Sequence, residues 1–159
     1  MFLALSSFRK FKVYQMDIKF AFLNGDLKEE VYVEQLEGFI LGNDAKHVCK
    51  LKKALYGLKQ ALRAWHYRLD KYLQQQGFTK GSVDNKLYTK IENDKLLIIV
   101  VYVDDITFGS NEESMSQNFA FVMQQEFEMS LLGELTYFIG LQVQQAKDDV
   151  FLSQTKCLK

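Results

Sequence analysis

The chain has 159 residues, of which 48% are hydrophobic and 25% are charged, and this composition is typical of a globular protein rather than a disordered one. Twenty basic side chains balance twenty acidic ones, so the formal net charge is zero, which argues against a nucleic-acid-binding protein. Two cysteines give no disulfide framework, the longest apolar run, 96–103, is too short to span a membrane, and the first residues lack the basic start of a signal peptide. We therefore expect one soluble intracellular domain, in the cytoplasm or the nucleus, without a membrane partner.

Hydrophobic spacing in the first half predicts two helices and three strands. Residues 12–18 alternate and lead to an acid, Asp17, as in a strand that ends at a polar residue. From Leu55 to Leu73 the apolar residues are three and four apart, which is typical of an amphipathic helix, and Gly77 is placed to end it. The predicted elements are helices over 1–11 and 55–73 and strands over 12–18, 30–35 and 47–52.

The second half predicts hairpins and one further helix. The acid pair Asp104-Asp105 joins two apolar runs and is predicted to form the tight turn of a β-hairpin. Ser110 and Glu113 have the spacing of a capping box, which opens a helix that continues through Phe127. Strands are predicted over 86–91, 95–103, 106–108, 136–144 and 150–153. This order predicts an α+β fold, with helices packed on one face of an antiparallel sheet.

The zero net charge hides two charged stretches of opposite sign. Residues 46–71 carry eight basic side chains and one acid, a local charge of +7, interleaved with Tyr56, Trp65 and Tyr67. Residues 104–149 carry nine acids and one lysine, a local charge of −8. A basic block with aromatic residues is typical of phosphate binding, although a solvated helix face gives the same pattern.

Asp104 and Asp105 interrupt a strongly apolar run, where an uncompensated pair of charges is costly. Asp17, at the end of another predicted strand, is the natural third carboxylate. Three carboxylates favour a hard divalent cation, with Mg²⁺ as the first choice and Mn²⁺ as an alternative. Two such ions about 4 Å apart support an in-line phosphoryl displacement without a histidine or serine base. The alternative is a hairpin turn that happens to contain two aspartates.

Longer motifs extend this pattern along the chain. They are QMDIKFAFLNGDLKEEVYV (15–33), CKLKKALYGLKQALRAW (49–65), YVDDI (102–106), GELTYFIGLQV (133–143) and FLSQTK (151–156). In this order they resemble the reverse transcriptase of copia-type long-terminal-repeat retrotransposons. The resemblance implies an α+β polymerase palm with part of the fingers and the activity of an RNA-directed DNA polymerase. It also implies an RNA/DNA primer-template, deoxynucleoside triphosphates and the remainder of a Pol polyprotein as partners.

The resemblance assigns the chemistry to three carboxylates. Asp17 matches the first catalytic, metal-binding aspartate of the family, and Asp104 and Asp105 match the pair in its hairpin motif. The carbonyl of Ile18 is expected to join the metal shell, with two Mg²⁺ ions at the site.

Further residues match substrate-binding positions of the family. Phe22 matches the aromatic side chain that screens the sugar 2′ position and so favours deoxynucleotides, and Gln60 matches a glutamine before the helix that lines the nucleotide pocket. Lys59 and Arg63 are candidates for phosphate contacts with nucleic acid, and Tyr102 for a contact near the primer end. An ordinary core or surface position is the alternative for each of them.

Departures from the family pattern lead to a second hypothesis. The family usually has proline at the positions of Leu36 and Leu62, and this chain has no proline. We expect Leu62 to let its helix start earlier or fray, because proline preorganises a first helical turn. One cytosine-to-thymine transition per codon is enough to produce each change, and decay of a silenced element is our hypothesis for them. The chain is expected to be one partial domain, 1–159, without upstream fingers strands, a thumb, ribonuclease H or integrase, and the alternative function is a catalytically silent relic that folds and binds nucleic acid.

Overall fold

The computed structural model describes residues 2–39, 47–146 and 149–154. The chain divides into two compact units. Residues 1–19 and 73–159 form the first, which we call the sheet unit, and residues 20–72 form the second, which we call the insert unit.

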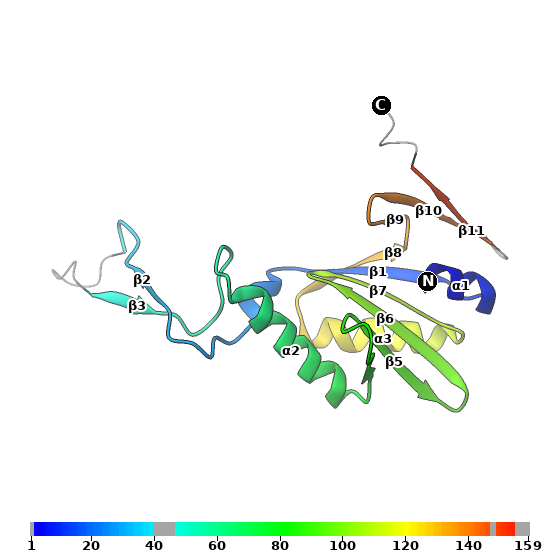
Figure 1. Cartoon of the computed structure of the whole chain (residues 1–159), viewed down its shortest axis with the longest axis horizontal. Helices are drawn as coiled ribbons and strands as arrows, with labels where there is room; N and C mark the ends of the chain where they lie inside the picture. The colour runs from blue at the N-terminus through cyan, green and yellow to red at the C-terminus, as the bar shows by residue number, and fades with distance from the viewer. Residues whose placement is uncertain (1, 40–46, 147–148, 155–159) are drawn as a thin grey trace. The chain divides into compact units, whose positions relative to one another are not determined.

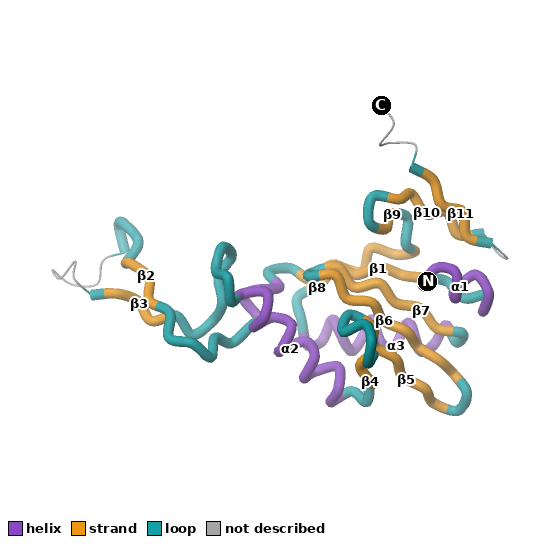
Figure 2. The backbone as a smooth tube through the Cα atoms, in the orientation of Figure 1, coloured by secondary structure: helices purple, strands orange, loops and turns teal. Residues whose placement is uncertain are grey.

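The sheet unit is built on a six-stranded sheet with the order β4-β5-β6-β7-β1-β8, and it also holds a three-stranded sheet, β11-β10-β9. Figures 1 and 2 show β1 between β7 and β8, although β1 comes first in the chain. Neighbouring strands are antiparallel throughout both sheets. The elements are α1 (Phe2–Arg9), β1 (Val13–Ile18), β4 (Thr79–Lys80), β5 (Leu87–Glu92), β6 (Lys95–Tyr102), β7 (Asp105–Ser110), α3 (Glu113–Glu126), β8 (Met129–Glu134), β9 (Tyr137–Phe138), β10 (Leu141–Gln145) and β11 (Val150–Ser153). The structure is thus α+β, as predicted.

Strand register divides the side chains of the large sheet between two faces. Tyr14 lies opposite Phe108 in the neighbouring strand, so these two side chains share one face. Gly109 lies opposite both Val13 and Ile98, and these three residues share the other face. Successive residues of a strand point to opposite faces, so the rest of each strand follows the same alternation.

α3 packs on the face that carries Phe108. The ring of Phe119 on α3 lies 4.9 Å from the ring of Phe108 and 5.6 Å from that of Phe78, edge to face in both cases. Phe119 and Met123, one helical turn apart, are both buried. Each fully buried side chain of this size contributes about 1.5–3 kcal/mol relative to an exposed one.

α1 packs on the opposite face, which corrects the expectation that helices cover one face alone. Leu3 of α1 joins Val13, Ile98 and Val143 in one buried apolar cluster. Val13 and Ile98 lie on this second face of the six-stranded sheet. Leu3 of α1 and Val143 of the three-stranded sheet cover them.

Gly109 makes the close packing of this second face possible. A Cβ atom at residue 109 would lie 2.6 Å from the carbonyl oxygen of Lys12 and 2.8 Å from a ring carbon of Phe11. Such distances are below van der Waals contact, so the chain that follows α1 approaches β7 this closely only because residue 109 has no side chain.

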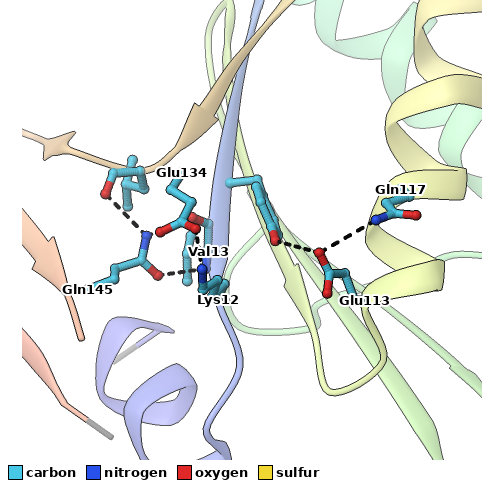
Figure 3. Close-up of polar contacts among 8 residues, drawn as sticks. Lys12, Val13, Glu113, Gln117, Glu134 and Gln145 are labelled. Carbon is cyan, nitrogen blue, oxygen red and sulfur yellow. Dashed lines mark hydrogen bonds and ion pairs between the residues drawn. The ribbon is translucent and has the colours of Figure 1, made fainter. Parts of the chain in front are cut away.

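The side chain of Gln145 fastens the three-stranded sheet to β1. Its amide oxygen accepts the backbone N–H of Val13 at 2.8 Å, and its amide nitrogen donates to the carbonyl oxygens of Val13, at 2.8 Å, and Leu135, at 3.2 Å (Figure 3). One side chain of β10 thereby hydrogen-bonds to the backbone of β1 and to that of Leu135, which itself donates its N–H to the Val13 carbonyl at 2.8 Å.

The insert unit contains η1 (Ala21–Asn24), an antiparallel pair of strands, β2 (Tyr32–Glu34) and β3 (Val48–Lys50), and most of α2 (Ala61–Gln75). Gly25 lies against α2, because a Cβ at residue 25 would be 2.7 Å from the backbone nitrogen of Trp65. The buried face of α2 includes Trp65 and Leu69, as the apolar spacing predicts.

α2 begins at Ala61, six residues later than the predicted start. The expectation that Leu62 lets this helix start earlier or fray, in comparison with a chain that has proline there, stays a prediction. Gly57 adopts a φ of +89°, and the preceding turns are closed by short backbone bonds from Leu58 to Leu55 and from Ala61 to Leu58. Apolar spacing gives no sign that a glycine adopts a left-handed conformation. The prediction therefore extended the helix through these turns.

Two predictions in the C-terminal half need correction. The predicted strand over 136–144 is a hairpin, β9–β10, because Ile139 and Gly140 adopt φ values of 48° and 78° and reverse the chain. Ser110 does not cap α3 as a capping box would; it ends β7, and its hydroxyl accepts the backbone N–H of Glu112 at 3.1 Å.

Candidate active site

β1 and β7 place two of the predicted aspartates opposite each other. Asp17, the last residue but one of β1, pairs in register with Asp105, the first residue of β7, and both side chains are half-buried. Directly opposed residues in an antiparallel pair have Cβ atoms about 4.5–5.5 Å apart. The two carboxylates therefore share one end of one sheet face.

The turn between β6 and β7 consists of Val103 and Asp104, because Tyr102 pairs with Asp105. This corrects the predicted Asp104-Asp105 turn. Val103 has a φ of 54°, which is rare for a β-branched residue and costs about 1–3 kcal/mol. Because the turn is this tight, Asp105 is already paired in β7, and Asp104 lies at the tip of the β6–β7 hairpin.

A backbone hydrogen bond holds the hairpin tip against the end of β1. The N–H of Ile18 donates to the carbonyl oxygen of Asp104 at 3.0 Å. Since Ile18 follows Asp17 directly, this bond fixes the backbone of all three aspartates relative to one another. The expected contribution of the Ile18 carbonyl to a metal shell stays a prediction.

The three carboxylates interact electrostatically. Burial raises the pKa of Asp17 above its ordinary value, and the negative charges of Asp104 and Asp105 raise it further, while Lys19 opposes the shift. Because the ionised form of Asp17 is disfavoured by burial and by the two neighbouring negative charges, a bound positive charge would stabilise it.

Gln15 is a site residue that the sequence prediction missed. Its side-chain amide donates to Oδ1 of Asp105 at 2.9 Å, across from β1 to β7. Gln15 lies two residues before Asp17 and so on the same sheet face. The strand alternation over 12–18 places it on that face, but its partner, Asp105, is known only from the pairing of β1 with β7.

Tyr102 is held by contacts on two sides and is 39% exposed. The ammonium nitrogen of Lys86 lies 4.1 Å from its ring centroid, and the ring of Phe138 meets it edge to face at 6.3 Å. Tyr102 pairs with Asp105, so its side chain lies on the same face as that carboxylate. Its predicted contact with a primer end stays untested.

The donors at this site fit a hard divalent cation by their chemistry, because Asp17, Asp104 and Asp105 offer only oxygen and repel one another. In the part of the chain that the structure describes, no group of three or more His, Cys, Asp or Glu side chains is close enough to hold a metal ion. Coordination of Mg²⁺ or Mn²⁺ by the three aspartates therefore stays a prediction.

The candidate nucleotide-binding residues Phe22 and Gln60 belong to the insert unit. The ring of Phe22 is half-buried and lies 4.7 Å from the ring of Tyr56. Gln60 directly precedes α2, although the apolar spacing predicted it inside a helix over 55–73, and its carbonyl oxygen accepts the N–H of Ala64 at 2.9 Å. Their roles toward a nucleotide stay predictions.

The basic block lies on the insert unit, where acids from 26–30 neutralise part of it. Lys53 pairs with Asp26, Lys50 with Glu30, and Arg63 with Glu29. Because residues 20–72 contain nine basic and seven acidic side chains, the unit carries a formal charge of only +2.

Two candidate phosphate-binding residues, Lys59 and Arg63, are exposed on this unit. Arg63 lines a cavity of about 330 Å³ together with Lys28, Glu29 and Tyr67. Within it, the ammonium of Lys28 lies 3.8 Å from the ring centroid of Tyr67. Cations beside an exposed aromatic ring are a typical arrangement for contacts with single-stranded nucleic acid.

None of the described helices is both long enough and apolar enough to cross a membrane.

The whole chain, residues 1–159, matches a family model described as reverse transcriptase (RNA-dependent DNA polymerase). No solved structure matches it significantly.

Curated relatives agree with this match. The chain is 37% identical over 148 residues to the retrovirus-related Pol polyprotein from transposon RE1 of Arabidopsis thaliana, which covers 93% of this chain and 10% of the relative. It is 34% identical over 160 residues to that from transposon TNT 1-94 of Nicotiana tabacum, covering 99% of this chain and 12% of the relative. A putative transposon Ty5-1 protein of Saccharomyces cerevisiae is 31% identical over 139 residues, covering 87% of this chain and 45% of that protein. The chain thus spans about a tenth of the two Pol polyproteins.

Proposed function

The chain belongs to the reverse transcriptase (RNA-dependent DNA polymerase) family, and from this we propose that it is the part of a copia-type Pol polyprotein that adds deoxynucleotides to a primer on an RNA template. The observation that carries the proposal is the register of β1 and β7, in which Asp17 lies opposite Asp105, with Asp104 at the adjoining hairpin tip.

Asp17, Asp104 and Asp105 would hold Mg²⁺, with Mn²⁺ as an alternative, and the carbonyl of Ile18 would add a ligand. When bound, two such ions activate the attacking oxygen and stabilise the leaving oxygen of an in-line phosphoryl displacement. Gln15 keeps one lone pair of Asp105 engaged through its 2.9 Å hydrogen bond and so fixes the orientation of that carboxylate.

The insert unit would supply the contacts to the incoming nucleotide. Phe22 would exclude a 2′-hydroxyl group by the bulk of its ring, whose position is supported by the contact with Tyr56. Gln60, at the start of α2, would line the nucleotide pocket. In this proposal the insert unit corresponds to part of the polymerase fingers, and the sheet unit corresponds to the palm.

Primer-template binding would use residues of both units. Lys59 and Arg63 would contact phosphates of the nucleic acid, and Tyr102 would contact the primer end. The remainder of the Pol polyprotein would complete the grip on the duplex, since positioning supplies much of the rate in phosphoryl transfer.

Primer extension tests this proposal. The full chain is incubated with an RNA template, a DNA primer, deoxynucleoside triphosphates and Mg²⁺, and compared with its Asp105→Asn and Asp104→Asn variants. We expect extension that requires the cation and falls at least about 100-fold in both variants, since outer-shell changes alone typically cost 10–100-fold.

Asp94→Asn is the matched control, because Asp94 is exposed in the turn of the neighbouring hairpin, β5–β6, where its φ of 62° is one that asparagine also tolerates. Its activity should equal that of the unchanged chain. Equal losses in Asp94→Asn and Asp105→Asn contradict the site, and absence of extension at high protein and template concentration contradicts the activity of this chain. Salt-sensitive duplex binding without extension supports the silent nucleic-acid-binding relic.

A further inference from the structure

Lys86 is a basic residue that the structure places beside the aspartate site. Its ammonium nitrogen lies 4.1 Å from the ring centroid of Tyr102. Tyr102 pairs in register with Asp105, and Asp105 pairs with Asp17, so these three side chains share one face of the six-stranded sheet. The ammonium of Lys86 therefore lies on the face that carries two of the candidate metal ligands.

The loop between β4 and β5, residues 81–86, holds the backbone of Lys86 in place (teal between β4 and β5 in Figure 2). The carbonyl oxygen of Lys86 accepts the N–H of Val101 at 2.9 Å, and its own N–H donates to Oδ1 of Asp84 at 2.9 Å. Gly81 packs closely inside this loop, because a Cβ at residue 81 would lie 2.7 Å from the carbonyl oxygen of Asp84. Two hydrogen bonds thus fix the backbone of Lys86 next to the end of β6.

Lys86 is exposed, and among the residues that the structure describes no acidic side chain forms an ion pair with its ammonium. Other lysines of the sheet unit are paired, namely Lys12 with Glu134, Lys19 with Glu128, Lys90 with Glu92 and Lys95 with Glu112. A paired lysine must leave its carboxylate before it can bind another anion, whereas Lys86 has no such partner to leave. Its charge is therefore available to an anion at this sheet face.

In the proposed function, on which this inference rests, a primer-template duplex lies at the aspartates and brings its phosphates close to Lys86. The carboxylates of the site repel a polyanion, so a cation near them helps to hold the duplex there. Lys86 directly precedes β5, and β6 lies between β5 and β7, so its backbone lies about 10 Å from that of Asp105 at the usual strand spacing of about 4.8 Å. Successive phosphates of one strand are about 3.4 Å apart along the helix axis, so this distance spans about three nucleotides.

We propose that Lys86 is a further nucleic-acid-binding residue, whose ammonium contacts a backbone phosphate within about three nucleotides of the primer end. Primer and template strands carry the same phosphate group, and the contact is with one of them. The ring of Tyr102 holds the ammonium beside the site before the duplex arrives. Lys86 therefore loses less side-chain freedom on binding than a lysine that extends freely into water.

Titrations of the full chain with a DNA primer annealed to an RNA template, at several salt concentrations, test the proposal. Lys86→Met keeps an unbranched apolar side chain but loses the charge, so it should weaken binding several-fold and lower the salt slope by about 1. Lys86→Arg retains a cation that can lie over the ring and should keep the slope. Lys80→Met is the matched control, because the ammonium of Lys80 also lies beside a ring, 5.8 Å from that of Tyr88, but on the sheet face that α3 covers. Its salt slope should equal that of the unchanged chain.

Neutral methylphosphonate linkages, placed one at a time in the primer or in the template strand, identify the phosphate. At one position within about three nucleotides of the primer end, the neutral linkage should weaken binding by the unchanged chain and have no further effect on Lys86→Met. The strand that shows this coupling is the one that Lys86 contacts.

The proposal is overturned if Lys86→Met keeps the salt slope of the unchanged chain, if Lys80→Met loses as much, or if no neutral linkage in either strand couples to Lys86. Primer extension is measured separately from binding. Extension by a chain whose Lys86→Met variant binds normally overturns the contact and leaves the proposed function standing. Coupling of Lys86 to one phosphate without extension supports the contact and contradicts the activity.

Discussion

Asp17 is the candidate site residue whose pKa is raised by its surroundings in the fold. Folding raises its pKa, first by burial and then through Asp104 and Asp105. An acid with a raised pKa binds its proton more tightly in the folded state than in the unfolded one. The folded state therefore loses stability as the pH rises through the raised pKa, and below the ordinary value near 3.8 this penalty is absent.

Asp17→Asn is expected to raise the melting midpoint by a few degrees at pH 7, because asparagine cannot take on the penalised charge. The gain should shrink as the pH falls and vanish below about pH 3.5, where the aspartate is protonated in both folded and unfolded chains. Thermal melts of both proteins between pH 3 and pH 8 measure this. A gain that is the same at every pH would show that the charge of Asp17 is not its cause.

At the residue scale the sequence singled out the three aspartates as candidates, and it did not single out the side chain that hydrogen-bonds one of them. Asp104 and Asp105 stand out because an apolar run makes charged residues conspicuous. Gln15 does not, because a glutamine in an alternating strand is ordinary until its partner across the sheet is known.

The β6–β7 hairpin is the element on which the site depends, and its turn is strained at Val103. Val103→Asn should stabilise the fold by about 1 kcal/mol, because asparagine adopts a positive φ more readily than a β-branched residue. Val103→Ile keeps the branched Cβ and should give no gain. Urea unfolding of both variants tests this, and equal stabilities of the two would contradict strain as the cause.

On the side of the sheet that α1 covers, β7 needs a residue without a side chain at Gly109. Gly109→Ala should destabilise the fold by about 1–3 kcal/mol, since the new Cβ would meet the Lys12 carbonyl at 2.6 Å, a backbone atom that cannot rotate away. Thr107→Ala, two residues earlier on the same face of β7, is the comparison in urea unfolding. A cost at Gly109 no larger than that at Thr107 would contradict the close approach.

Elements with a strong period were predictable, and irregular ones were not. The apolar run that forms β6 and the spacing of α2 both identified their element, since burial imposes those patterns. β8 was not predicted, because Met129–Glu134 lacks alternation and takes a register irregularity against β1 near Gly133, whose φ is 90°. A bulge adds one extra residue to one strand of a pair, and the amino-acid composition of the segment gives no sign of it.

At the scale of the whole molecule, the sequence predicted the α+β class but not the division into two units. Charge counting along the chain indicated a block of +7, whereas the fold pairs Lys50, Lys53 and Arg63 with acids that lie outside that block. Pairs between distant segments are invisible to a local sum, so the basic surface is weaker than the sequence alone indicates.

This pairing predicts unequal contributions to nucleic-acid binding. Lys59→Ala should weaken binding of an RNA–DNA duplex and lower the salt slope by about 1, as for one lost phosphate contact. Arg63→Ala should have a smaller effect, because Arg63 must leave Glu29 to reach a phosphate. Duplex titrations at several salt concentrations measure both slopes, with Lys95→Ala in the sheet unit as control. Equal slopes for Lys59→Ala and Lys95→Ala would contradict a role for this surface.

The central claim is that Asp17, Asp104 and Asp105 act as one cation-binding site, and paramagnetic broadening by Mn²⁺ tests it most directly. NMR spectra of the full chain with substoichiometric Mn²⁺ should lose the amide signals of these residues and of Ile18 first, and Asp105→Asn should restore them. Mg²⁺ in excess should also restore them by competition. Broadening that begins elsewhere in the chain, or that persists unchanged in Asp105→Asn, would contradict the claim.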